Sequence, residues 1–288
     1  MMGAVLHFQQ FIRFLEQPML ATDKVFSGSI PEVYDRYLVP LIFESYAIDL
    51  ARRVALTDPQ DVLETAAGTG VLTRAIASRL PEYARLLATD LNQEMLERAK
   101  GQQYHHHRIE WKQANALALP FPDQGFDVVA CQFGVMFFPD KVQGYKDAHR
   151  VLKPGGRFVF NVWDRISENE FADTVTEALA ALFPHDPPRF LTRTPHGYHN
   201  VEKIREELTA AGFAHVSIET AEHTSKAASP SDPAIAYCQG TPLRNEIEVR
   251  DTPCLEDATR FATAALMRRF GIGPIQGRIR AHVITATG

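Results

Sequence analysis

The segment from Asp61 to Gly70 reads Asp-Val-Leu-Glu-Thr-Ala-Ala-Gly-Thr-Gly and limits the fold more than any other part of the chain. An apolar run ends at Glu64, small residues follow, and a Gly-x-Gly opens onto an amphipathic segment. This pattern predicts a strand, a tight turn and a helix. Gly68 and Gly70 can take positive φ and carry no Cβ, so a ligand can lie against the backbone there. Open parallel sheets bind ligands at this end of their strands.

Strand patterns and helix patterns alternate along the chain after this turn. We expect strands at residues 62–66, 85–89, 109–113, 126–131, 157–163 and 213–220. We expect helices at residues 71–80, 93–101, 140–152 and 201–211. This alternation predicts βαβ units and therefore a right-handed, doubly wound parallel sheet of the α/β class.

A second acidic residue, Asp90, stands at the end of the second predicted strand. A carboxylate in this place accepts hydrogen bonds from the ribose hydroxyls of an adenosine. Combined with the glycine turn, Asp90 favours a cofactor that contains adenosine over a turn that is purely structural.

The composition is that of an ordinary folded protein. The 288 residues carry a net charge of −5, with 23% charged and 45% hydrophobic residues, which argues against disorder. No segment is basic enough to follow a phosphate backbone, so we expect no nucleic-acid partner. The three cysteines have neither disulfide nor zinc spacing, which favours a reducing cytoplasm. The consecutive histidines at 105–107 do not have the spacing of metal ligands, and we expect no metal site.

The apolar N-terminal stretch, residues 4–20, is interrupted by Arg13 and Glu16, and no basic segment precedes it. We therefore expect neither a signal peptide nor a helix inserted in a membrane. Its spacing predicts a short helix that packs on the body or on a second copy in a homodimer; alternatively, translation starts at Met19. Residues 31–56 are expected to form one or two helices, whose aromatic residues either cover the site as a lid or belong to the helix surface and core.

Five ordered motifs give the chain a resemblance to a known family. They are Leu63–Gly70, Asp90, Gln113–Pro122, Phe126–Val129 and Arg150–Gly156. Together they resemble the class I S-adenosylmethionine-dependent methyltransferases, in particular the small-molecule branch that includes the quinone-biosynthesis methyltransferases. The resemblance covers residues 34–164 well and the remainder loosely.

The resemblance implies a Rossmann-like, doubly wound sheet of seven strands with the last strand antiparallel, and residues 279–285 fit that strand. It also implies a division of the chain, because a helical segment separates the sixth strand from the last. The expected parts are N-terminal helices or lid (1–56), a cofactor-binding core (57–224), a helical insertion or cap (225–276) and the final strand (277–288). Within the insertion, helices are expected at 233–239 and 255–270, with an irregular stretch at 241–253.

The resemblance also implies a site for S-adenosylmethionine. Glu64 and the backbone from Ala66 to Gly70 would hold the amino-acid end, Asp90 the ribose, and Leu91 and Met95 the adenine. Ala66 replaces a frequent glycine, and we expect a turn residue at negative φ. The remaining expected cofactor contacts are Tyr34, Gly68, Gly70, Asn115, Ala116 and Gln132.

At Asn115 the family often has Asp, and the asparagine oxygen can still accept a hydrogen bond from the adenine amino group. Gln132 is expected near either the sulfonium or the acceptor.

Methyl transfer by in-line displacement requires mainly alignment and exclusion of water, because the sulfonium methyl is already activated. A general base is needed only where the nucleophile must lose a proton, and His196 is the candidate. Phe133, Trp163, Tyr198 and Arg244 are candidate substrate contacts, with a surface salt bridge as the alternative for Arg244. The identity of the acceptor and the methylated atom stay open.

Three functions fit these observations. The first is an S-adenosylmethionine-dependent methyltransferase that acts on a small organic acceptor. The second is an NAD-dependent oxidoreductase, which shares the glycine turn and Asp90. The third is a protein that binds S-adenosylmethionine without catalysis.

Overall fold

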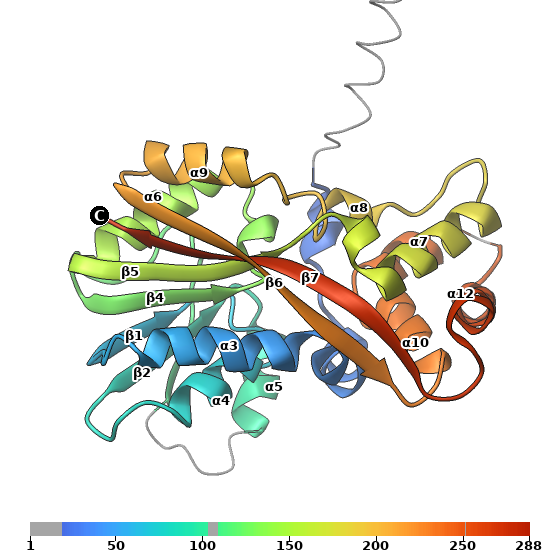
Figure 1. Ribbon diagram of the computed structural model, residues 1–288, viewed down its shortest axis with the longest axis horizontal. Helices are drawn as coiled ribbons and strands as arrows, with labels where there is room; N and C mark the ends of the chain where they lie inside the picture. The colour runs from blue at the N-terminus through green and yellow to red at the C-terminus, as the bar shows by residue number, and fades with distance from the viewer. Residues whose placement is uncertain (1–18, 103–108, 251) are drawn as a thin grey trace, which may run out of the picture.

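The computed structural model describes residues 19–102, 109–250 and 252–288. The N-terminal helix expected at 4–20 falls almost wholly outside these residues, as does the histidine run at 105–107. Seven strands form one sheet in the order β3-β2-β1-β4-β5-β7-β6 (Figure 1). The strands are β1 (Asp61–Glu64), β2 (Arg85–Asp90), β3 (Ile109–Gln113), β4 (Phe126–Gln132), β5 (Leu152–Trp163), β6 (His215–Ala227) and β7 (Ile275–Thr287).

The pairing confirms the expected sheet. Strands β3, β2, β1, β4 and β5 are parallel, whereas β7 is antiparallel to both of its neighbours, β5 and β6. The final strand of the chain therefore lies inside the sheet, and β6 lies at its edge. All five parallel strands point their carboxyl ends toward the same edge, and this edge carries the candidate site.

Helices cover both faces of the sheet, α6 and α9 on one face and α3, α4 and α5 on the other (Figure 1). Their bounds are α3 (Glu44–Ala55), α4 (Val71–Ala77), α5 (Gln93–Gly101), α6 (Lys141–Val151) and α9 (Val201–Ala210). Buried strand residues alternate between the two faces, as the period of a strand requires. Val128 and Val159 pack with α3 and α4, while Val129 and Phe158 belong to the larger core on the other face.

Local side-chain chemistry starts two of these helices. Asn92 accepts hydrogen bonds from the backbone N–H groups of Glu94 and Met95 at the start of α5. Asn200 caps α9 in the same way. Both helices begin at the residue expected from the sequence, and asparagine is a favoured residue directly before a helix.

The N-terminal helices run along the side of the site. They are η1 (Ala21–Lys24), α2 (Ile30–Val33), the π-helix η2 (Tyr34–Phe43) and α3. The helical expectation for residues 31–56 is confirmed. The wider turn of η2 contains Pro40, which has no N–H to donate to a regular ladder.

A cap of helices stands beside the carboxyl ends of the strands (Figure 1). It consists of α7 (Glu170–Leu182), α8 (Phe190–Arg193), α10 (Ser231–Gln239), α11 (Leu243–Glu248) and α12 (Leu255–Phe270). Two short 3-10 turns, η3 (Val135–Phe137) and η4 (Ile166–Glu168), lie at the ends of β4 and β5. The bounds expected for α12 are confirmed. The prediction of an irregular stretch at 241–253 is wrong, because α11 forms within it.

Strands β5, β6 and β7 are each at least five residues longer than expected. β6 and β7 pair in unbroken register from His215 with Thr287 to Ala227 with Ile275. Most of the residues in β6 are polar, because it is an edge strand, and so an apolar alternation did not mark its second half. Within the residues that the structure describes, no helix combines the length and the apolar character that crossing a membrane requires.

Candidate active site

A cavity of about 510 Å³ lies at the carboxyl edge of the sheet, enclosed by η2, the loops after β2, β3 and β4, and the cap. Most of the residues expected to form the site line this cavity. They are Tyr34, Ala66, Gly68, Asp90, Leu91, Met95, Asn115, Ala116, Gln132, Phe133, Trp163 and His196. Four expected residues, Glu64, Gly70, Tyr198 and Arg244, are not among the lining residues.

The turn after β1 has the left-handed backbone that its glycines allow. Gly68 has φ +57° and Gly70 has φ +81°. Ala66 also has positive φ, +53°, so the expectation of negative φ at this position is wrong. Gly134, across the turn, leaves space for the methyl group of Ala66. A Cβ added at Gly134 would lie 2.5 Å from the Cβ of Ala66.

Asp90 is joined to this turn directly. One carboxylate oxygen accepts a hydrogen bond from the backbone N–H of Gly68 at 2.8 Å, and the other accepts from the N–H of Asn92 at 2.8 Å. Burial raises the pKa of Asp90, while these backbone donors act against the rise. The carboxylate is therefore held in one orientation at the cavity wall.

Glu64 lies behind the turn and not in the cavity wall. Its side chain is buried, and Oε2 has no hydrogen-bond partner. Burial raises its pKa to about 8. Gly70 allows Trp111 to pack closely against the turn, because a Cβ added at Gly70 would lie 2.9 Å from Cη2 of Trp111.

The region expected to hold an adenine is formed by the loops after β2 and β3. Met95 is buried, while Leu91 is 54% exposed at the rim. Asn115 lines the cavity, and its Oδ1 accepts a hydrogen bond from the N–H of Leu117 at 3.0 Å. The oxygen expected to receive a ligand donor thus already has one partner and keeps a second lone pair.

Aromatic rings line the other half of the cavity. Phe133 stacks on Trp163 with centroids 3.8 Å apart and planes 6° apart. Phe43 is tilted against both rings at 5.5 and 5.9 Å, and Tyr34 stacks on Phe43 at 5.1 Å. These rings make this half of the cavity aromatic and largely apolar.

Asn161 fixes the backbone beneath this stack, and the sequence reasoning missed it. Phe133 has φ +50°, and its N–H donates to both the carbonyl oxygen and Oδ1 of Asn161, at 3.2 and 3.0 Å. The available signal was a polar residue inside the otherwise apolar run of β5. Beside it, Gln132 donates from Nε2 to the carbonyl of Phe43, which leaves Oε1 without a partner.

His196 reaches the cavity from the loop before α9. Its Nδ1 lies 2.9 Å from the carbonyl oxygen of Asp164. A carbonyl can only accept, so the neutral ring carries its proton on Nδ1 and keeps a lone pair on Nε2. Burial lowers the pKa of His196 to about 4, so the ring is neutral near pH 7.

Two expected substrate contacts lie elsewhere. The hydroxyl of Tyr198 is 3.0 Å from that of Tyr145 and donates to Glu207, so Tyr198 belongs to the packing of α6 against α9. Arg244 pairs with Glu248 at 2.7 Å, which confirms the alternative of a surface salt bridge.

Several lining residues come from segments that gave no site signal. Lys24 and Phe26 come from the N-terminal segment, and Phe190 and Tyr237 come from the cap. The N-terminal segment is held at both ends. Asp23 pairs with Arg193 in a buried contact, and Nδ2 of Asn92 donates to the carbonyl of Phe26 at 3.0 Å.

The described residues contain no group of three or more side chains able to hold a metal ion. The class of reaction follows from comparison with known proteins. Residues 23–226 match the model of the ubiE/COQ5 methyltransferase family. The chain belongs to this family. The match covers the N-terminal helices, the glycine turn, Asp90 and all strands but the last.

Individual relatives agree with this assignment. The chain is 38% identical over 169 residues to the ubiquinone/menaquinone biosynthesis C-methyltransferase UbiE of Escherichia coli O1:K1, a match that covers 54% of this chain and 67% of that protein. The UbiE of Proteus mirabilis is 28% identical over 73% of this chain and 88% of its own length. A methyltransferase structure from Thermotoga maritima, 15% identical, matches the fold with a TM-score of 0.52, over 91% of this chain and 97% of that chain.

The ubiE/COQ5 assignment decides between the three functions that the sequence allowed. The protein is a class I S-adenosylmethionine-dependent methyltransferase that acts on a small molecule. The other two functions, an NAD-dependent oxidoreductase and a non-catalytic binding protein, are not supported by this assignment.

Proposed function

We propose that the cavity binds S-adenosylmethionine at its Asp90 end and a planar, largely apolar acceptor against the Phe133–Trp163 stack. The single observation that carries this proposal is that both surfaces belong to one continuous cavity. The names of the relatives support an aromatic acceptor of the quinol type.

The residues present fit the cofactor. Asp90 is oriented by Gly68 and has a carboxylate suited to a pair of ribose hydroxyls. The absence of a Cβ at Gly68, where nothing lies within 4 Å of the Cβ position, leaves open space for a ligand against the backbone. Glu64, with its unpartnered Oε2 behind the turn, is positioned to act on a positively charged amino group through an intervening water. We retain Tyr34, Ala66, Leu91, Met95, Asn115, Ala116 and Gln132 as proposed contacts.

S-adenosylmethionine, when bound, supplies a methyl group on a sulfonium that becomes a neutral thioether after transfer. The chain aligns the acceptor and excludes water, for which the aromatic wall is suited. His196 receives at Nε2 the proton that a hydroxyl or activated carbon of the acceptor loses. A neutral imidazole with a free Nε2 has the state that a base requires.

We also propose the expected division of the chain, because the segments on either side of the core contribute residues to the cavity. Phe26, Tyr34 and Phe43 from residues 1–56 line the cavity, as do Tyr237 and Thr241 from residues 225–276. This supports a lid at 1–56 and a helical insertion at 225–276 around a core at 57–224, with residues 277–288 completing the sheet; the cap described above joins this insertion to α7 and α8 of the core. The three free cysteines support a cytoplasmic location, and a homodimer formed through the N-terminal segment stays a prediction.

Calorimetric titration with S-adenosylmethionine and with NAD tests the cofactor. We expect binding of the methyl donor only, and binding of NAD alone would overturn the proposal. A second measurement follows release of S-adenosylhomocysteine with hydroquinones, phenols, amines and carboxylates as acceptors. Turnover of amines or carboxylates in place of the hydroquinones and phenols would refute the proposed acceptor class.

A further inference from the structure

The position of His196 depends on one main-chain atom at the end of β5. Within the described residues, the only hydrogen bond from its imidazole goes to the carbonyl oxygen of Asp164. Nδ2 of Asn169 lies 3.4 Å from the same oxygen. The direction of the Asp164 carbonyl therefore decides which ring nitrogen of His196 holds the proton.

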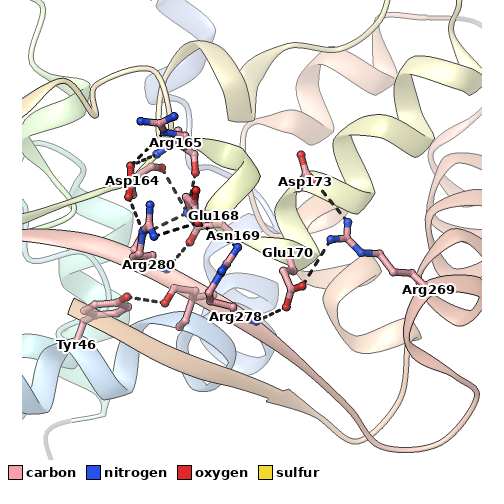
Figure 2. A network of polar contacts seen from close by, with 11 residues as sticks. Tyr46, Asp164, Arg165, Glu168, Asn169, Glu170, Asp173, Arg269, Arg278 and Arg280 are labelled. Atoms are coloured by element: carbon pink, nitrogen blue, oxygen red, sulfur yellow. Dashed lines mark hydrogen bonds and ion pairs between the residues drawn. The ribbon is translucent and has the colours of Figure 1, made fainter. Parts of the chain in front are cut away.

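The carboxylate of Asp164 is itself buried and fully engaged. Its side chain is 5% exposed, and Oδ2 accepts from Nε of Arg280 at 2.7 Å. Oδ1 accepts from the backbone N–H of Arg165 at 2.6 Å, and Nε2 of His282 lies 3.4 Å from it. Figure 2 shows Asp164, Arg165 and Arg280 gathered at one point of this network.

Arg280 comes from β7 and is held on several sides. Its backbone carbonyl accepts from the N–H of Asp164 at 3.0 Å, and its backbone N–H donates to Oδ1 of Asn169 at 3.1 Å. Its guanidinium also pairs with Glu168 at 3.1 Å, and the same glutamate pairs with Arg278 (Figure 2). Backbone and side-chain contacts thus join the same two residues, Asp164 and Arg280.

A buried carboxylate that loses its arginine partner must find another donor or rotate toward water, because an unpaired buried charge is strongly unfavourable. The N–H of Arg165, which donates to Oδ1, belongs to the same peptide as the Asp164 carbonyl, so movement of the carboxylate would turn this peptide as well. Loss of the ion pair is therefore expected to turn the carbonyl away from His196, while the β5–β7 ladder keeps the strand in place.

We propose that Asp164 and Arg280 are positioning residues for His196, whose ion pair directs the Asp164 carbonyl so that Nδ1 holds the proton and Nε2 faces the acceptor. The catalytic consequence rests on the proposed function, whereas the position of the proton does not. Neither residue contacts the cavity, so both act through His196.

Nitrogen-15 NMR of histidine-labelled protein measures the tautomer directly. His196→Gln assigns the signal among the 11 histidines. We expect a pure Nδ1–H form in the wild type, a mixture of tautomers in Arg280→Gln and Asp164→Asn, and partial recovery in Arg280→Lys. The matched control is Arg269→Gln, which removes the contacts of another arginine of the network, with Glu170 and Asp173, and should leave the signal unchanged.

The kinetic measurement uses the same variants with S-adenosylmethionine and the best acceptor. Displacement of a catalytic group costs about tenfold to a hundredfold in kcat, with KM for the methyl donor unchanged. A wild-type tautomer in both Arg280→Gln and Asp164→Asn overturns the positioning role, whatever their activity. An altered tautomer together with full activity of His196→Gln supports the positioning role and refutes the proposed base.

Discussion

Phe133 directly follows β4 and Trp163 ends β5, yet their rings lie 3.8 Å apart and within 6° of parallel. Both residues line the cavity. Trp163→Leu removes the stacking partner and about 1 kcal/mol of aromatic interaction. We expect KM for the acceptor to rise by about tenfold and the affinity for S-adenosylmethionine to change little, as measured by steady-state kinetics and calorimetry. Phe261→Leu, a change on the exposed side of α12, is the control.

Asp90 should carry much of the cofactor affinity. Asp90→Asn removes the charge from its hydrogen bonds, which are worth about 1.5–3 kcal/mol each when charged. We expect the dissociation constant for S-adenosylmethionine to rise by at least about tenfold in calorimetric titration. Asp123→Asn, at a surface ion pair with Arg150, should have no such effect. An unchanged affinity in Asp90→Asn would remove the ribose assignment.

The strained turn offers a stability measurement. Ala66 has φ +53°, a region that glycine occupies without penalty. Ala66→Gly is expected to raise the free energy of unfolding by about 1 kcal/mol in denaturant titration. Ala75→Gly, inside α4, should lower it by about the same amount. Equal destabilisation by both changes would contradict the strain.

Glu64 makes stability depend on pH. Burial raises its pKa to about 8 from the ordinary 4.5 of a glutamate, so the folded state binds the proton more strongly than the unfolded state. The stability that this tighter proton binding contributes is fully present below pH 4.5 and is lost as the pH rises toward 8. In Glu64→Gln, the free energy of unfolding relative to the wild type should therefore increase by about 1 kcal/mol per pH unit between pH 5 and 8. Parallel pH profiles would show that Glu64 is ionised in the folded protein.

His196 should keep its basic form in mildly acidic solution. Since burial lowers its pKa to about 4, protonation of this ring cannot reduce activity between pH 8 and 6. The rate of methyl transfer should therefore show no fall near pH 6.5 from this residue. His196→Gln should lower kcat by about a hundredfold or more. A wild-type rate in that variant would leave alignment alone as the source of catalysis.

The cofactor half of the site could be predicted because its signals are local. The glycine turn and Asp90 each follow directly from a recognisable strand, and the order of the sheet brings them together. The same reasoning missed the sign of φ at Ala66, because that angle depends on Gly134 in a distant loop. It also did not anticipate that the Glu64 side chain is buried behind the turn and does not line the cavity, so that only an indirect action on the ligand is proposed.

The acceptor half depends on contacts between distant parts of the chain. Phe26 and Tyr237 are far apart in the sequence and both line the cavity, near which Asp23 pairs with Arg193 and α10 packs beside η2. No spacing rule connects such residues. Tyr198 shows the reverse error, since this expected substrate contact packs against Tyr145 and does not line the cavity.

The ribbon formed by β6 and β7 has a consequence for how this enzyme can change. Residues 228–274 leave the sheet after Ala227 and return to it at Ile275, which are paired partners in the ladder. The insertion therefore enters and leaves the core at a single place. We expect that exchanging these residues for those of a relative would replace Tyr237 and Thr241 at the cavity, while Asp90 and the glycine turn keep their own supports. On the function proposed above, acceptor choice could then change without loss of the cofactor half.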